Sequence, residues 1–172
     1  MAKLLMSVGT YQNFPENIHK ETRFSTSLSN KKLQQTVIQT LNELNTHASR
    51  LDEVSEPSIP GCIVVFEFGI AESNNFSYLN AEEAKDVIEV VNKEPFSLMD
   101  FLCILRYYVT RDGKKKPLKF DYYMIRFLFD KNLVTMRVFH EKGPRYVSPE
   151  DMVNLVTRNV NQMLCKTVLT TF

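Results

Sequence analysis

The sequence predicts an α+β domain built on a mainly antiparallel sheet with about four helices, in the order ββα-β-αα-ββα, as a single layer of sheet packed by helices. Two apolar runs within 120–143 are separated only by a short polar turn, which is typical of an antiparallel hairpin. Helical apolar spacing recurs behind capping residues in several segments. No strand-like run is followed by a glycine-rich turn, so a doubly wound nucleotide-binding fold is not expected.

Length and composition are those of a protein that folds by burying its own core. The chain has 172 residues, of which 44% are hydrophobic and 24% charged. These values suit one globular domain over 1–172 and argue against wholesale disorder. The cysteines lie far apart in apolar runs, which predicts buried free thiols rather than a metal site or a disulfide framework. They are Cys62, Cys103 and Cys165.

The first sixty residues contain two predicted strands, one helix and one loop. Short apolar runs predict strands near 3–8 and over 22–28. Helical spacing behind Ser29 or Asn30 as the N-cap predicts an amphipathic helix to about residue 45. Residues 46–60 hold charges, serines and two prolines without a sustained apolar pattern, so they are expected to form an exposed, flexible loop.

The middle of the chain predicts one strand and one helix. The run 62–71 is rich in β-branched and aromatic residues, and both of its faces are largely apolar apart from Glu67. A buried strand is therefore expected. Asn80 and Glu83 then form a capping box for a helix over 81–92.

A second capping pattern, Ser97 with Asp100, precedes the apolar run 98–109, which predicts a central buried helix. Residues 110–119 are expected to form a connecting loop. After the hairpin, a Ser-Pro start followed by acidic residues predicts a helix over 149–166.

The hairpin carries the most unusual pattern. If Lys131 and Asn132 form a two-residue turn, Arg126 lies opposite Arg137 on a face shared with aromatic and aliphatic side chains. Like charges directly opposed are unfavourable unless an acid approaches. Three sources stay open: Glu67 if its strand joins this sheet, a carboxylate of a partner protein, or nucleic-acid phosphate.

Catalytic and cofactor motifs are absent from the sequence. There is no GxxxxGK[ST] or GxGxxG loop and no GxSxG elbow. His140 and Glu141 would point to opposite faces of a strand, so they do not predict an acid-base pair. We expect no catalytic residue, no metal, no cofactor and no small-molecule site, and the protein is more readily interpreted as a non-enzyme.

Charge is distributed unevenly along the chain. Residues 67–100 carry two basic and eight acidic side chains, whereas 101–172 carry thirteen basic and six acidic ones. Such blocks can form binding surfaces or neutralise one another within the fold. The run of three lysines within 111–119 is the best nucleic-acid signal, although a solvated turn has the same composition.

These observations predict a protein-binding or scaffold domain that acts as a subunit of a multiprotein assembly or as a homodimer. The partner-binding residues would be Tyr122, Arg126, Arg137 and Phe139. The alternative is a nucleic-acid-binding module that uses Lys114, Lys115, Lys116, Lys119, Arg126 and Arg137. No apolar run is long enough to span a bilayer, so no membrane association is expected and the location is predicted as intracellular and cytoplasmic, with a nuclear one left open.

Overall fold

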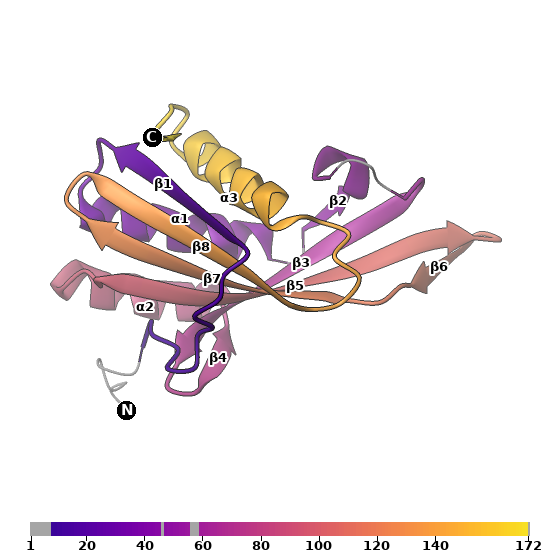
Figure 1. Cartoon of the computed structure of the whole chain (residues 1–172), viewed down its shortest axis with the longest axis horizontal. Coiled ribbons are helices and arrows are strands. Elements are labelled where there is room, and N and C mark those ends of the chain that lie inside the picture. Colours follow the sequence, from indigo (N-terminus) through magenta and orange to yellow (C-terminus); the bar gives the residue numbers. More distant parts are fainter. Residues whose placement is uncertain (1–7, 46, 56–58, 172) are drawn as a thin grey trace.

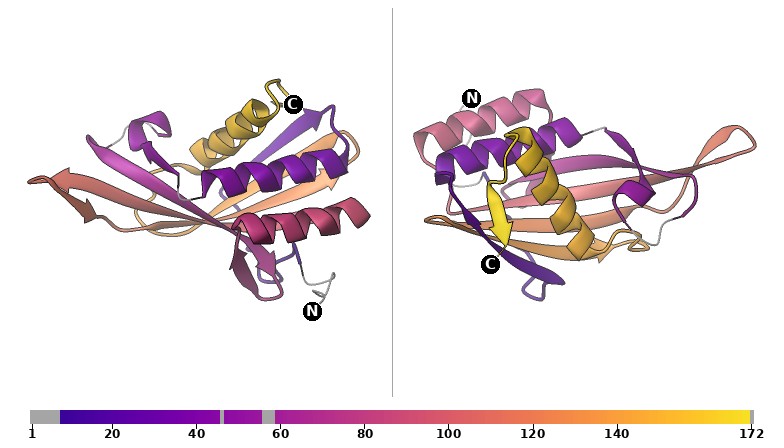
Figure 2. Two further views of the ribbon diagram at one scale, coloured as in Figure 1. Left: turned by 180° about the vertical axis from the view of Figure 1, so that it is seen from behind. Right: turned by 90° about the horizontal axis from the view of Figure 1, so that it is seen from above.

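A strongly twisted antiparallel sheet with three α-helices on one face forms the protein (Figures 1 and 2). The computed structural model describes residues 8–45, 47–55 and 59–171. The main path of the sheet is β2-β3-β5-β7-β8-β1-β9, with β4 paired to β3 and β6 paired to β5. The strands are β1 (Lys20–Thr26), β2 (Ala48–Arg50), β3 (Cys62–Glu72), β4 (Asn75–Tyr78), β5 (Leu98–Arg111), β6 (Lys114–Pro117), β7 (Asp121–Asp130), β8 (Leu133–Lys142) and β9 (Leu169–Thr171).

The helices gather on one side of the sheet (Figure 2). They are α1 (Asn30–Leu44), α2 (Ala81–Lys93) and α3 (Pro149–Met163), and a 3-10 turn, η1, covers Leu51–Glu53. Each α-helix begins as the sequence predicts, with the side chains of Ser29, Asn80 and Ser148 accepting a backbone N–H of the first turn. Within the described residues, no helix is both long and apolar enough to cross a membrane.

Strict alternation divides the two faces of the sheet. Alternate side chains of β3, β5, β7 and β8 are buried under the helices, for example Phe66, Phe101 and Ile125, which are 0% exposed. Most of their neighbours along each strand point to the opposite face and are only partly buried, whereas Asp100 and Ala71, near the N-terminal segment, are fully buried. The core therefore lies between the sheet and the helices.

The predicted helix over 98–109 is wrong, because this segment is the central strand β5. It pairs with β3 on one side and β7 on the other. A strand that is apolar on both faces loses its period of two, so length and apolar content alone resemble a buried helix. The helix count falls from about four to three as a result.

Other short elements were predicted as loops or not predicted. The 46–60 segment contains β2 and η1, and residues 110–119 contain β6. The strands β4 and β9 were not predicted. The strand expected at 3–8 lies outside the described residues except for Val8, which forms an isolated bridge with Glu72. Cys62 and Cys103 are buried as predicted, whereas Cys165 is exposed.

The hairpin prediction is confirmed in its turn and register. Asp130 pairs with Leu133 around the turn, and Arg126 lies opposite Arg137. Asn132, the second residue of the turn, adopts the left-handed conformation, with φ of 58°, which asparagine tolerates better than most residues. A register shift between Tyr122 and Tyr123 then moves Lys142 opposite Tyr122.

A buried asparagine joins helix α1 to the edge of β3. Asn45 follows the last turn of α1, and its Nδ2 donates to the carbonyl of Leu79 over 2.6 Å. Its Oδ1 accepts the N–H of Phe68. Asn45 thus satisfies backbone groups of β3 and of the segment that leads into α2, in a place that water does not reach.

We expect Asn45→Ala to lower the free energy of unfolding by about 2 kcal/mol, because it leaves the buried N–H of Phe68 without its partner and the Leu79 carbonyl with Asn42 as its remaining amide donor. Urea denaturation at neutral pH measures the change. Asn92→Ala is the matched control, since Asn92 is exposed on α2. A loss for Asn45→Ala no larger than that for Asn92→Ala would contradict this role.

Candidate functional site

The face of the sheet that no helix of the described residues covers is the first candidate site, and we call it the open face. It is formed by the outward side chains of β3, β5, β7, β8 and β1. Three ion pairs lie across it, and each joins neighbouring strands. The pairs are Glu67–Arg106, Asp100–Arg126 and Glu21–Arg137.

Arg126 is held by Asp100 on the neighbouring strand. Its Nε and Nη2 donate to the two carboxylate oxygens over 2.7 and 2.9 Å, a bidentate arrangement. The N-terminal segment covers this pair: Tyr11 N–H donates to Asp100 over 2.7 Å, and the guanidinium lies over the Phe14 ring at 4.4 Å. Asp100 is fully buried, so Arg126 is occupied within the chain.

Arg137 is also paired, but nearer to solvent. Glu21 lies directly opposite it on β1, and the Nε to Oε1 distance is 2.7 Å. Phe139, two residues along β8, stacks on His19 with ring centroids 4.7 Å apart. The face around Arg137 and Phe139 therefore contacts the chain's own residues 19–21.

The expectation that Glu67 meets Arg126 or Arg137 is wrong. Since β5 lies between β3 and β7, Glu67 is opposite Ile104 and reaches Arg106 over 2.8 Å. With 98–109 taken as a helix, neither Asp100 nor Arg106 could be placed on this sheet. Glu67 was therefore the one acid within the chain that was considered as a partner for these arginines.

The remaining predicted residues lie at the other end of the open face. Tyr122 is half-buried, and the Nζ of Lys142 lies 4.4 Å from its ring centre. Lys114, Lys115 and Lys116 are exposed on β6, and Lys119 is exposed just beyond it. The predicted set therefore divides into arginines that are paired within the chain and lysines that face solvent.

Between these two ends the open face is apolar. Its partly buried aliphatic side chains come from the three central strands, and we call them the aliphatic band. They are Ile63, Val65, Leu102, Ile104 and Met124. Strand pairing sets Leu102 opposite Met124 and Val65 opposite Arg106.

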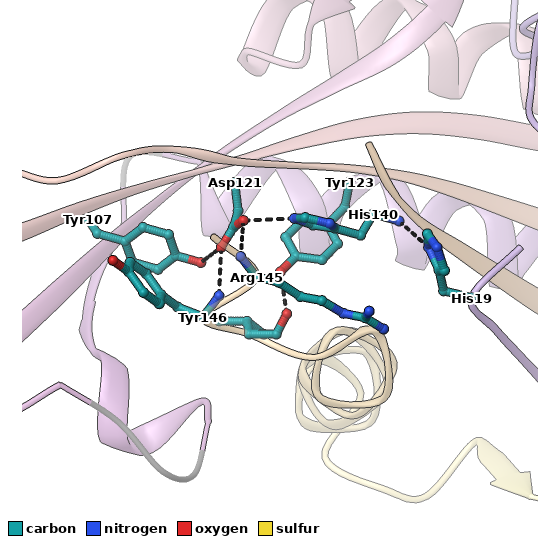
Figure 3. A network of polar contacts seen from close by, with 8 residues as sticks. His19, Tyr107, Asp121, Tyr123, His140, Arg145 and Tyr146 are labelled. Carbon is teal, nitrogen blue, oxygen red and sulfur yellow. Dashed lines mark hydrogen bonds and ion pairs between the residues drawn. The ribbon is translucent and has the colours of Figure 1, made fainter. Parts of the chain in front are cut away.

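A second candidate site is a polar network under the helices, shown in Figure 3. Asp121, the first residue of β7, is fully buried. Its carboxylate accepts four hydrogen bonds of 2.5 to 2.9 Å. The donors are Tyr107 Oη, His140 Nε2 and the backbone N–H groups of Arg145 and Tyr146.

This network holds the loop before α3 against the sheet. Two of the four bonds come from loop backbone, and Tyr123 Oη donates to the carbonyl of the next loop residue, Val147. Burial, and the bond to Asp121, raise the pKa of Tyr107 well above its ordinary value, so the phenol remains a donor. A carboxylate with four donors has its lone pairs filled, which suits a structural anchor.

Asp121 with His140 also resembles the pair that orients a catalytic base. In the described part of the chain, however, His140 has no hydrogen bond to a hydroxyl or thiol that it could activate. Its backbone N–H donates to His19 Nδ1 over 2.9 Å, which ties β8 to the start of β1. The arrangement can fix a loop and two strands, and it supplies no nucleophile.

Sequence reasoning missed Asp121, Asp100 and Glu21. The burial of Asp121 was predictable, because the alternation that places Tyr123 and Ile125 on the core face extends back to it. A buried carboxylate needs hydrogen-bond donors, so a polar network could have been expected there. Glu21 and Asp100 required the strand order.

Comparison with known proteins finds no matching family model, no matching curated protein and no matching solved structure. Among the described residues, no group of three or more His, Cys, Asp or Glu side chains is placed to hold a metal ion.

Gly143 lies against the Asp121 network, with φ of +114°. A Cβ there would stand 2.2 Å from the Phe120 carbonyl oxygen and 2.5 Å from Asp121 Oδ1. We expect Gly143→Ala to cost at least about 3 kcal/mol of stability in chemical denaturation, because backbone rather than a flexible side chain must move.

Gly113→Ala is the matched control for that variant. Gly113 also has a positive φ, +72°, but nothing lies within 4 Å of its added Cβ. It should cost only about 1 kcal/mol, the strain of a left-handed residue. Equal losses for the two variants would show that crowding at Asp121 is unimportant.

The raised pKa of Tyr107 predicts an alkaline effect on stability. Below the ordinary value of 10.0 the phenol is neutral in both states, so its contribution is fully present. Above pH 10 the unfolded chain loses the proton and the folded one keeps it, which lowers the free energy of unfolding by about 1.4 kcal/mol per pH unit.

Stability measured from pH 9 to 11 tests this effect. Tyr107→Phe should be less stable than wild type at pH 8, because Asp121 loses a donor, yet its stability should fall less steeply above pH 10. Tyr78→Phe, at an exposed tyrosine, should follow the wild-type slope. A Tyr107→Phe slope equal to that of wild type would refute the assignment.

Proposed function

We infer that this protein is a non-enzymatic protein-binding domain whose contact surface is the aliphatic band of the open face. The observation that carries this proposal is the position of the band. Its five side chains lie on the central strands of the sheet, where helices cover the opposite face but, in the part of the chain that the structure describes, none covers this one (Figure 2). Apolar side chains grouped on an uncovered face mark a contact surface.

The charges around the band favour a second copy of the chain as the occupant. The three arginines beside the band, Arg106, Arg126 and Arg137, are each paired with a carboxylate of the same chain, and a fourth, Arg23, is exposed farther away on β1. Two bands related by a two-fold axis can therefore approach without opposing unpaired charges next to them. Another subunit with a flat apolar surface is the alternative occupant, as a scaffold role would require.

The arginines Arg126 and Arg137 lie beside this surface as paired groups. Glu21 neutralises Arg137, which presents a hydrogen-bonded guanidinium near solvent, whereas Asp100 neutralises Arg126 beneath the N-terminal segment. Arginine in that state, near Tyr122 and Phe139, fits the rim of a protein interface better than a phosphate site.

Two measurements test the proposal: the mass of the protein in solution, and the effect of one substitution on its self-association. Light scattering after size exclusion should give a mass near twice 20.0 kDa at tens of micromolar chain. Met124→Glu places a carboxylate within the band and should raise the dissociation constant at least about tenfold, since an unpaired charge would be buried. Circular dichroism and thermal unfolding check that the variant is folded.

Gln39→Glu, an exposed change on α1 away from the sheet, is the matched control and should leave the mass unchanged. A wild-type protein that stays monomeric at about 100 μM contradicts a second copy as occupant. Association that Met124→Glu does not weaken would place the contact surface elsewhere.

A further inference from the structure

We propose that the β5–β6 hairpin and the aromatic rings beside it form a binding site for single-stranded nucleic acid. The hairpin, which we call the basic arm, comprises residues 110–119. It extends beyond the helices at one end of the sheet (Figures 1 and 2). The proposal does not require self-association, although the site adjoins the aliphatic band at Arg106 and Tyr122.

The arm carries a concentrated positive charge. Five basic side chains and one acidic residue, Asp112, lie within it, and most of the segment is exposed. Antiparallel pairing sets Arg111 opposite Lys114 and Val109 opposite Lys116, on one side of the ribbon. Lys115, opposite Thr110, projects from the other side. The arm therefore presents cations to both sides.

Unlike Arg106, Arg126 and Arg137, most of these cations have no acid beside them. In the described chain no ion pair involves Lys114, Lys115 or Lys116. Their charge is thus available to neutralise phosphates and release counterions.

Aromatic rings follow the arm onto the open face, each with a cation over it. Lys115 Nζ lies 4.5 Å from the ring centre of Tyr108, and Arg106 Cζ lies 4.5 Å from that of Phe120. Lys142 Nζ lies 4.4 Å from the ring centre of Tyr122. We call these three pairs the cation–aromatic row.

The row points to single strands rather than to a duplex. Tyr108 and Arg106 are alternate residues of one strand, so successive pairs are about 7 Å apart along the sheet. Rings at such positions on an uncovered sheet can stack unpaired bases, while flanking lysines contact the backbone. The bases of a duplex are stacked on one another, so their faces cannot stack on these rings. An acidic protein surface would pair with the lysines but would gain no stacking on the rings.

The recognition expected is tolerant of sequence. The rings supply stacking, and lysine contributes charge without a fixed hydrogen-bonding pattern. We therefore expect affinity to depend on salt and on base stacking rather than on base identity.

Fluorescence anisotropy with a labelled twenty-nucleotide oligothymidylate tests the proposal on the full chain. Binding should appear at low salt and weaken steeply as salt rises. Replacing Lys114, Lys115 and Lys116 together by Gln should reduce the slope of log affinity against log salt by about 2, since each phosphate contact on a single strand contributes about 0.7. Tyr108→Leu, which keeps an apolar side chain but no ring to stack, should weaken binding roughly 5- to 100-fold at fixed salt.

The matched control removes three exposed lysines from helices, namely Lys31, Lys32 and Lys85, each changed to Gln. This variant should keep the wild-type slope. A duplex of the same sequence length and polyglutamate should compete poorly with the oligonucleotide.

Three results would overturn the proposal: no binding at low salt, an equal loss in the helix-lysine control, or full competition by duplex or polyglutamate. Competition by polyglutamate would identify the arm as a site for an acidic protein instead. Wild-type affinity in a folded Tyr108→Leu variant would likewise exclude base stacking at the row.

Discussion

Most of the structure depends on the pairing of β5 between β3 and β7. This strand joins the hairpin of the second half of the chain to the long strand of the first half. Its inward side chains complete the core under the helices, and its outward side chains divide the open face into a charged end and an apolar centre. If β5 were a helix, the sheet would break into two smaller ones. Asp100 would then not lie opposite Arg126, because that position follows from the pairing of β5 with β7.

The same strand explains which parts of the fold could be predicted from sequence. Helices α1, α2 and α3 have caps and one apolar stripe each, so local patterns determine them. The β7–β8 register follows from a two-residue turn. β5 could not be recognised from alternation, because both of its faces are apolar. The Asp112-Gly113 pair at its end is a strong hairpin signal and could have identified β5 and β6 together.

The candidate sites show a similar division. The opposition of Arg126 and Arg137 depends only on one hairpin and was predictable. Their acids come from strands far away in sequence, so identifying Asp100 and Glu21 requires the order of the strands. The Asp121 network combines both cases. Its position on the core face follows from alternation, but the loop that supplies two of its donors has no pattern that would place it there.

The N-terminal segment has a consequence for how the molecule is assembled. Gly9 lies between the diverging ends of two strands, where it donates to Ala71 and accepts from Asp100. Tyr11 reaches Asp100 across 89 positions of sequence. Bringing residues so far apart in sequence together costs conformational entropy, which the few contacts of this segment offset only in part. The groups that the segment binds, Ala71 and Asp100, are in place only when β3 and β5 have paired. The segment that completes the open face is therefore expected to dock late in folding, after the sheet that receives it.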